Sequence, residues 1–356
     1  MTRVVRIDPR QPDLARIREV AAVLREGGLV AFPTETVYGL GAHALHAPAV
    51  ARIFDAKGRP ATDPIIVHLA DADQLDAVAQ AVPDAARSLA AAFWPGALTL
   101  ILEKRSIVPD AVTAGLHTLG VRVPAHPIAH ALIVAAGVPV AAPSANRFSR
   151  PSPTRAEHVL ADLDGVVDII IDGGATPIGV ESTIIDLTVS PALVRRPGGV
   201  SLEDIRRVVP GARSVSEIAD RDSAQPAPGQ LLRHYAPRAT LTLYIGALET
   251  VIERMANDIR AAVASGSRAG VLAPEEDLLA LAPRLAAVGA SGRVVTMKCG
   301  TRRDRDAAAR DLFQAVRALD AEGVDVIFAS APAGEGINAA IIDRLTRAAE
   351  GRVVRT

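Results

Sequence analysis

Short apolar segments alternate with amphipathic stretches near the start of the chain, and this pattern constrains the fold more than any other feature. Arg3–Ile7 and Leu29–Phe32 have the composition of strands. The periodicity of Leu14–Glu26 between them predicts a helix that ends at Gly27-Gly28. Two buried strands joined through a helix are typical of a helix-covered sheet, so the chain is predicted to belong to the α/β class.

The predicted sheet continues through seven further apolar segments: Ile65–Leu69, Ala97–Leu102, Val121–Val123, Val138–Ala142, Ile169–Asp172, Thr183–Leu187 and Leu193–Arg196. The last three follow one another with little helix between them, which predicts antiparallel or mixed pairing rather than a doubly wound sheet. Apolar residues make up 49% of the chain and aromatic residues 3%. This composition favours helices packed on a buried sheet and argues against disorder.

The chain has 356 residues, enough for two domains, and its composition changes between them. Residues 211–238 are rich in Ser, Ala, Pro, Gln and Asp, as in a linker, but include the pair His234-Tyr235. A tether pinned to a domain surface by this one aromatic ring is an open alternative. Beyond the linker, four strand-like segments alternate with helical ones. We therefore predict a twisted mixed-sheet domain over residues 1–210, a linker folding over the active site, and a smaller parallel three-layer, Rossmann-like α/β domain over residues 239–356.

Charge and cysteine content narrow the classes of function. The net charge of -1 gives no overall attraction for nucleic acid, so nucleic-acid binding would need a local patch. Cys299 is the sole cysteine, which excludes internal disulfides and thiolate metal clusters. The charged start, MTRVVRIDPR, lacks a signal peptide, and the long uncharged run at residues 127–146 is broken by glycine and proline. We expect a soluble, cytoplasmic protein with no membrane partner.

A basic turn precedes one of the predicted buried strands. Lys57-Gly58-Arg59-Pro60 places two cations just before Pro64–His68. Such a turn offers charge-assisted hydrogen-bond donors to phosphate at the mouth of a fold, where small ligands usually bind. A solvated basic turn without a ligand is the alternative.

Further polar groups follow other strands. Phe32–Gly41 is expected to form a loop whose two threonines and Tyr38 offer neutral hydrogen bonds. Its two glycines superficially match a dinucleotide fingerprint, but the match lies too far from the strand for NAD binding. Ser144 and Asn146 follow the apolar strand at Val138–Ala142, where both side chains can point into one cleft or simply cap the strand in a turn.

Three arginines and a glycine-rich segment complete the candidate site. Thr118 and Arg122 flank another strand start, and arginine suits bidentate binding of a carboxylate. Val180–Thr183 follows several glycines that allow the backbone to approach a ligand closely. Arg195-Arg196 precedes a second glycine turn. The sequence contains neither a phosphate-binding G-x-x-x-x-G-K-[ST] loop nor a G-x-S-x-G nucleophile elbow, which argues against a P-loop ATPase and a serine hydrolase.

Eight ordered segments together resemble the YrdC-like family, in its long, two-domain L-threonylcarbamoyladenylate synthase form. They are FPTETVYGLG, KGRPATDPIIVHL, FWPGALTLIL, VRVPAHP, APSANRFSRPSPT, VESTIID, RRPGG and HYAP. They cover most of Gly28–Gly199 and the linker, whereas residues 239–356 fit the family's extra domain by pattern only.

The resemblance implies a nucleotidyltransferase. L-threonine, bicarbonate and ATP, with Mg2+, would give L-threonylcarbamoyl-AMP and pyrophosphate. The product would feed the t6A37 modification of tRNA through a separate downstream threonylcarbamoyl transferase, and weak binding of tRNA itself is left open.

The resemblance also assigns roles to individual positions. Lys57, Arg59, Ser144 and Asn146 would hold the ATP phosphates, with Lys57 and Arg59 stabilising the departing groups. The other nucleotide contacts would be Thr118, Arg196 and Tyr235. The positions implied for L-threonine are Thr34, Tyr38, His68, Arg122, the backbone of Ala142, and Ser182. No protein ligand for a metal is assigned.

Two positions depart from the family pattern. Asp63 stands where the family commonly has Asn, and a carboxylate there would repel triphosphate unless Mg2+ intervenes or the side chain turns away. Asp63 is therefore a candidate on the nucleotide side only. Ser149 occupies a site where the family often has Gly, so the path of the following loop is open.

Two other functions compete with the synthase. A protein that binds double-stranded RNA or tRNA without this activity could use a basic cleft, but the balanced charge and the absence of a long basic run disfavour it. Carbamoyl transfer in hydrogenase maturation also uses a YrdC-like domain. Those proteins carry cysteine-pair zinc fingers, which a chain with Cys299 alone cannot build.

Overall fold

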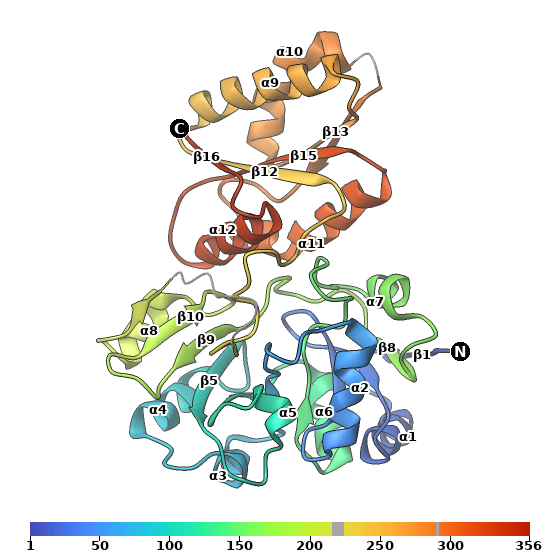
Figure 1. The fold of residues 1–356 in the computed structure, drawn as a ribbon, viewed down its shortest axis with the longest axis vertical. Helices are drawn as coiled ribbons and strands as arrows, with labels where there is room; N and C mark the ends of the chain where they lie inside the picture. Colours follow the sequence, from blue (N-terminus) through green and yellow to red (C-terminus); the bar gives the residue numbers. More distant parts are fainter. Residues whose placement is uncertain (216–223, 290–291) are drawn as a thin grey trace. The chain divides into compact units, whose positions relative to one another are not determined.

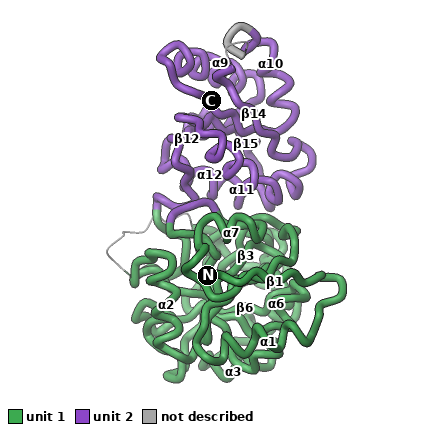
Figure 2. Tube along the Cα trace, turned by 90° about the vertical axis from the view of Figure 1, so that its right-hand side faces the viewer, with its two compact units in different colours: residues 1–148, 152–231 green, residues 149–151, 232–356 purple. Residues whose placement is uncertain are grey.

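A computed structural model describes residues 1–215, 224–289 and 292–356, so residues 216–223 of the predicted linker lie outside the described residues. The chain divides into two compact units (Figure 2). Unit 1 comprises residues 1–148 and 152–231, and unit 2 comprises residues 149–151 and 232–356. Each unit contains its own sheet.

Unit 1 is built on a mixed sheet of eleven described strands in the order β1-β8-β2-β3-β7-β4-β6-β5-β9-β10-β11. The strands are β1 (Arg3–Arg6), β2 (Val30–Pro33), β3 (Tyr38–His43), β4 (Val67–His68), β5 (Leu98–Glu103), β6 (Thr118–Arg122), β7 (Val140–Ala141), β8 (Ile169–Asp172), β9 (Thr183–Asp186), β10 (Leu193–Arg196) and β11 (Arg213–Ser214). The helices are α1 (Leu14–Arg25), α2 (Ala47–Lys57), α3 (Leu75–Val78), α4 (Asp84–Phe93), α5 (Asp110–Thr113), α6 (Pro127–Ala136), α7 (Ala156–Leu163) and α8 (Leu202–Val208), with a 3-10 turn at Ala72–Gln74.

The pairing in unit 1 confirms the predicted mixed sheet. β9 pairs parallel with β5 and antiparallel with β10. The expectation of a loop over Phe32–Gly41 is wrong, because β3 returns antiparallel to β2 with Phe32 opposite Gly39. A Cβ atom at Gly41 would lie 2.7 Å from the Phe32 ring and 2.9 Å from the Val140 side chain. Only glycine fits this close approach, and a glycine-containing strand resembles a loop in sequence.

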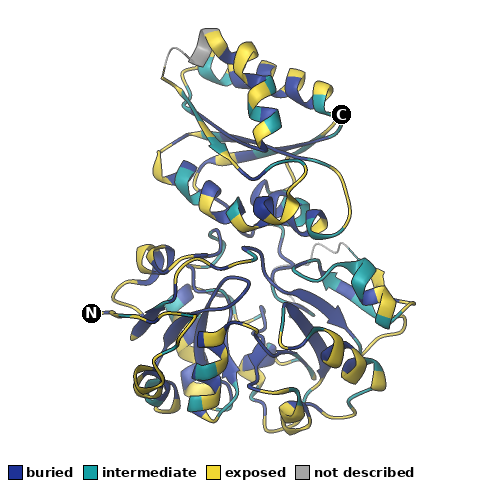
Figure 3. Ribbon diagram, turned by 180° about the vertical axis from the view of Figure 1, so that it is seen from behind, coloured by how far each residue is buried: buried dark blue, intermediate teal, exposed yellow. Residues whose placement is uncertain are grey.

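Helices cover both faces of this sheet. α1 and α6 pack against each other, and Ile17, Leu24, Ile128 and Leu132 form one core with Phe32. A larger core contains residues of α2 and α4 with the strands. Strands are largely buried whereas helices expose their outer faces (Figure 3). Among the described residues, none of the helices has both the length and the apolar character needed to cross a membrane.

Unit 2 is a parallel sheet in the order β14-β13-β15-β12-β16. Its strands are β12 (Thr240–Ile245), β13 (Ala269–Ala273), β14 (Val294–Lys298), β15 (Val326–Ala331) and β16 (Val353–Arg355). α9 (Leu248–Ala264) and α10 (Glu275–Gly289) cover one face, and α11 (Arg305–Ala321) and α12 (Ile337–Ala348) cover the other (Figure 1). The parallel three-layer prediction is confirmed; α10, which contains Pro283, and the short terminal β16 were not predicted.

Candidate functional site

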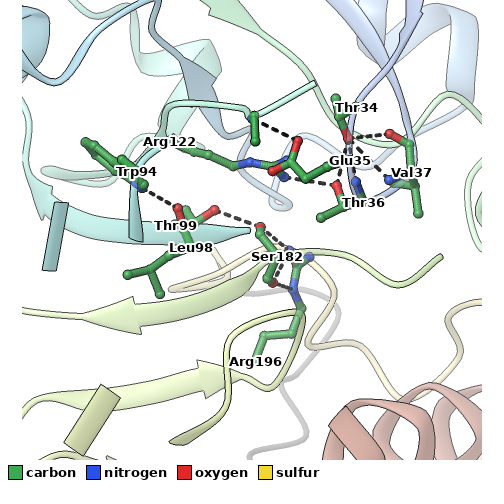
Figure 4. Close-up of polar contacts among 11 residues, drawn as sticks. Thr34, Glu35, Thr36, Val37, Trp94, Leu98, Thr99, Arg122, Ser182 and Arg196 are labelled. Carbon is green, nitrogen blue, oxygen red and sulfur yellow. Dashed lines mark hydrogen bonds and ion pairs between the residues drawn. The ribbon is translucent and has the colours of Figure 1, made fainter. Parts of the chain in front are cut away.

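Arg122, at the end of β6, is held by the turn between β2 and β3 (Figure 4). Its Nη2 donates to Glu35 Oε1 at 2.5 Å, and its Nη1 donates to Thr36 Oγ1 at 3.1 Å. The second carboxylate oxygen of Glu35 accepts the Ala125 amide at 3.1 Å. Arg122 and Glu35 are both buried, and the Arg122 Nε–H has no hydrogen-bond partner among the described residues. The guanidinium is therefore fixed on one side and still has a buried donor to satisfy.

A chain of hydroxyl groups continues from Arg122 to Thr34. Thr34 Oγ1 donates to the Val37 carbonyl at 2.6 Å and lies 2.8 Å from Thr36 Oγ1. A hydroxyl carries one hydrogen, so Thr36 is the donor to Thr34. Thr34 also accepts the Thr36 amide at 3.1 Å, which closes a local turn. These bonds link two residues of the predicted L-threonine set, Thr34 and Arg122, through Thr36.

Ser182 and Arg196 lie in direct contact, although the family resemblance implies different ligands for them. The Arg196 Nη2 donates to the Ser182 carbonyl at 2.9 Å and to its Oγ at 3.2 Å. The hydroxyl of Thr99, on β5, lies 2.8 Å from Ser182 Oγ (Figure 4). Thr99 is fully buried, and sequence analysis missed it because an isolated threonine in an apolar strand carries no signal of its own. The predicted nucleotide and amino-acid groups thus share a boundary at Ser182.

Lys57 connects the end of α2 to the segment that follows β7. Its Nζ donates to the main-chain carbonyls of Ser144 and Asn146, each at 2.5 Å. The Asn146 side chain donates its amide hydrogen to the Arg147 carbonyl at 2.7 Å. Three of the four predicted phosphate ligands are therefore brought together, and the lysine contacts the other two through backbone rather than side-chain atoms.

Arg59, like Lys57, donates hydrogen bonds to main-chain carbonyls, in this case those of the loop that follows it. Its Nε donates to the Asp63 carbonyl at 3.0 Å, and its Nη2 donates to the Pro64 carbonyl at 2.6 Å. The same Nη2 lies 3.0 Å from Asp63 Oδ1 in a buried ion pair. Burial raises the pKa of the Asp63 carboxyl, against the opposing charges of Arg59, then Lys57 and Arg196. The four groups therefore form one electrostatic cluster, in which the Asp63 side chain faces cations.

This cluster fits a phosphate better than a protein-held metal ion. Mg2+ usually binds one or two carboxylates together with substrate phosphates. Asp63 is fully buried, and its Oδ1 already pairs with the Arg59 guanidinium at 3.0 Å, so it is poorly placed to bind a metal ion. The described residues also contain no group of three His, Cys, Asp or Glu side chains placed to hold a metal.

His68 and Tyr38 are both buried candidates for the L-threonine site. His68 on β4 lies opposite Arg122 in the parallel pairing with β6, and its Nδ1 is 3.2 Å from the Ile66 carbonyl. The Tyr38 hydroxyl donates to the Gly174 carbonyl at 2.7 Å and accepts the Gly173 amide at 3.2 Å. Burial raises the Tyr38 pKa, so the phenol stays protonated. Tyr38 anchors the loop after β8, and its contact with L-threonine stays a prediction.

Ala142 and Thr118 are the remaining candidate residues of unit 1. The Ala142 amide donates to the Ile66 carbonyl at 2.9 Å, which leaves only its carbonyl for the predicted ligand contact. Thr118 lines a small pocket with Ile66 and Pro228. The Pro228 carbonyl accepts a hydrogen bond from Arg196 Nη1 at 3.3 Å. The part of the predicted linker around Pro228 therefore packs beside the candidate nucleotide residues.

Two predicted positions belong to unit 2. The Tyr235 ring centroid is 5.4 Å from that of Phe313, and the Arg344 guanidinium is 5.1 Å from the Tyr235 centroid. Its contact with a nucleotide stays a prediction. Ser149 has a φ of 68°, a left-handed conformation that favours glycine. The loop therefore follows the path a glycine would take.

The titration of His68 gives a first prediction. Burial, and then the charge of Arg122, lowers the His68 pKa to about 3. Below about pH 6.5 the unfolded chain binds a proton at His68 that the folded chain does not, so folding loses about 1.4 kcal/mol per pH unit as pH falls. We expect His68→Asn to reduce the loss of unfolding free energy between pH 6.5 and 4.5 by about 2–3 kcal/mol. Urea unfolding at several pH values measures this change. His117→Asn, at an exposed site, is the control, and an equal effect there would contradict the prediction.

Family models and solved structures match both parts of the chain. Residues 22–198 match the Sua5, YciO and YrdC family described as telomere recombination. Residues 200–350 match the family described as threonylcarbamoyl-AMP synthase, C-terminal domain.

Individual relatives match over nearly the full length. Threonylcarbamoyl-AMP synthase of Pyrococcus abyssi is 42% identical over 96% of both chains. The Bacillus subtilis protein of the same name is 43% identical over 96% of this chain and 94% of its own. A crystal structure of P. abyssi Sua5 complexed with L-threonine is 41% identical, covers 100% of both chains and has a TM-score of 0.91.

Proposed function

Since this chain belongs to the threonylcarbamoyl-AMP synthase family and is an enzyme of that class, we propose that it forms L-threonylcarbamoyl-AMP and pyrophosphate from L-threonine, bicarbonate and ATP. L-threonine is the ligand of the P. abyssi relative. The product would serve the t6A37 modification of tRNA through a separate transferase.

One contact carries this proposal: Arg196 binds the carbonyl and the hydroxyl of Ser182. On one side of it, Arg59 pairs with Asp63 at 3.0 Å, and the charges of Lys57 and Arg196 also act on this carboxyl. This concentration of positive charge suits a triphosphate. On the other side, Ser182 belongs to the set proposed for L-threonine. A nucleotide and an amino acid bound in these two places would lie next to each other, as a reaction between them requires.

The proposed reaction needs positioned reactants more than a nucleophilic side chain. The threonine amine adds to bicarbonate and water leaves, which gives a carbamate. A carbamate oxygen then attacks the α-phosphorus of ATP, and the bond to pyrophosphate breaks. Lys57 and Arg59 would neutralise the charge that develops on the departing phosphates, and Arg122 would bind the threonine carboxylate. Mg2+ bound to the triphosphate would supply further neutralisation.

Pyrophosphate release tests the proposal. With ATP, Mg2+ and bicarbonate present, adding L-threonine should start pyrophosphate production, and omitting bicarbonate should stop it. Detection of L-threonylcarbamoyl-AMP by mass spectrometry identifies the product. Pyrophosphate release that does not depend on threonine would refute the proposal, as would salt-sensitive RNA binding without ATP turnover.

A further inference from the structure

Glu35 is a buried carboxylate to which the proposed reaction assigns no role. It lies in the turn between β2 and β3, and its side chain is 9% exposed. Its two oxygens are used differently: one accepts Arg122 Nη2 at 2.5 Å and the other accepts the Ala125 amide at 3.1 Å. Glu35 therefore joins the hairpin turn to Arg122 and to the backbone just beyond β6.

Both oxygens of Glu35 point at donors of this chain, so it is poorly placed to act as the base for the threonine amine. It instead fixes the plane of the guanidinium together with Thr36, which holds Nη1 at 3.1 Å (Figure 4). A guanidinium that donates hydrogen bonds from both terminal nitrogens has little freedom to rotate. Its charge also stays balanced while the site is empty, which lowers the cost of burying it.

The Nε–H of Arg122 indicates which side of the guanidinium is left to bind a ligand. It is buried and has no hydrogen-bond partner among the described residues, whereas each terminal nitrogen has one. A buried donor without a partner costs free energy that a bound acceptor recovers. A purely structural ion pair between β6 and the hairpin would have no need of such a donor.

We propose that Glu35 is a positioning residue that orients Arg122, with help from Thr36, so that its Nε–H edge receives the carboxylate of the amino-acid substrate. This inference rests on the proposed function. It predicts that Glu35 affects recognition of the carboxylate specifically and leaves binding of the nucleotide unchanged.

Glu35→Gln tests the role with the least change of shape. Calorimetry of the full chain with L-threonine and, separately, with L-threoninamide compares a ligand that has the carboxylate with one that lacks it. Glu35→Gln replaces the charge-assisted hydrogen bond between Glu35 and Arg122, so Arg122 is held less firmly in its orientation. We expect this change to weaken L-threonine binding by about 10- to 100-fold. L-threoninamide and ATP should bind as they do to the unchanged chain. Thr36→Val, which removes the hydroxyl bonds to Nη1 and to Thr34, should weaken L-threonine binding as well.

Asp186→Asn is a matched control. Asp186 Oδ2 accepts Arg195 Nη2 at 2.9 Å in another largely buried pair of unit 1, so this change removes the same kind of charge. Thermal unfolding should show a similar loss for Asp186→Asn and Glu35→Gln, but only the latter should lower the preference for threonine over its amide. If Glu35→Gln weakened the binding of both ligands equally, or left threonine binding unchanged, the inference would be wrong but the proposed function would stand. If the unchanged chain binds no threonine, the proposed function fails and the inference fails with it.

Discussion

Lys57→Met is expected to reduce threonine-dependent pyrophosphate release by about a hundredfold or more, the effect of losing one charged contact to a transition state, about 2.7–4 kcal/mol. The change removes a positive charge from the cluster around Asp63 and frees the carbonyls of Ser144 and Asn146. Both effects act on the proposed phosphate site. Steady-state kinetics with ATP varied at saturating threonine and bicarbonate measures the loss in kcat/KM.

Lys104→Met is the control for Lys57→Met. It removes a lysine that also anchors a loop but lies outside the proposed phosphate site. The ammonium of Lys104 also donates to a main-chain carbonyl, that of Val108, at 3.3 Å, and it pairs with Asp110. Lys104→Met should therefore lower thermal stability with little change in activity. The assignment of Lys57 to the phosphates would be wrong if Lys57→Met kept near-normal kcat/KM for ATP while its stability fell as in Lys104→Met.

Arg122→Met should both destabilise the fold and abolish the threonine response. It leaves the Glu35 carboxylate buried without its cation, and breaking a buried pair in this way costs about 3–5 kcal/mol. Urea unfolding measures that cost. Threonine-dependent pyrophosphate release should fall below detection even under conditions where the variant is fully folded, because the proposed carboxylate ligand is gone.

The double variant Glu35→Gln with Arg122→Met distinguishes folding from binding. Removing both charges should recover most of the lost unfolding free energy, since no uncompensated charge remains buried. The threonine response should stay absent. Its recovery along with stability would mean that Arg122 supports the fold and does not bind the substrate.

The periodicity of the sequence was sufficient for the fold class because the spacing of apolar residues along a helix or strand is a local property of the chain. The predicted helix at Leu14–Glu26 differs from the observed α1 by one residue. The antiparallel return of β3 was missed because Gly39 and Gly41 lack the apolar side chains by which a strand is recognised. The close packing of Phe32 against Gly41, which makes glycine necessary there, exists only once the sheet has formed.

The sequence by itself determined the family, the α/β class and the residue types around the candidate site, since these follow from local pattern and ordered motifs. Only the tertiary structure decided how those residues use their hydrogen bonds. It placed Glu35 and Thr36 on Arg122, Thr99 on Ser182, and main-chain carbonyls on Lys57 and Arg59. The partners of these contacts lie between 4 and 89 residues apart, and only a folded chain removes water from them. Which buried donors find an acceptor within the protein, and which do not, depends on how the chain packs.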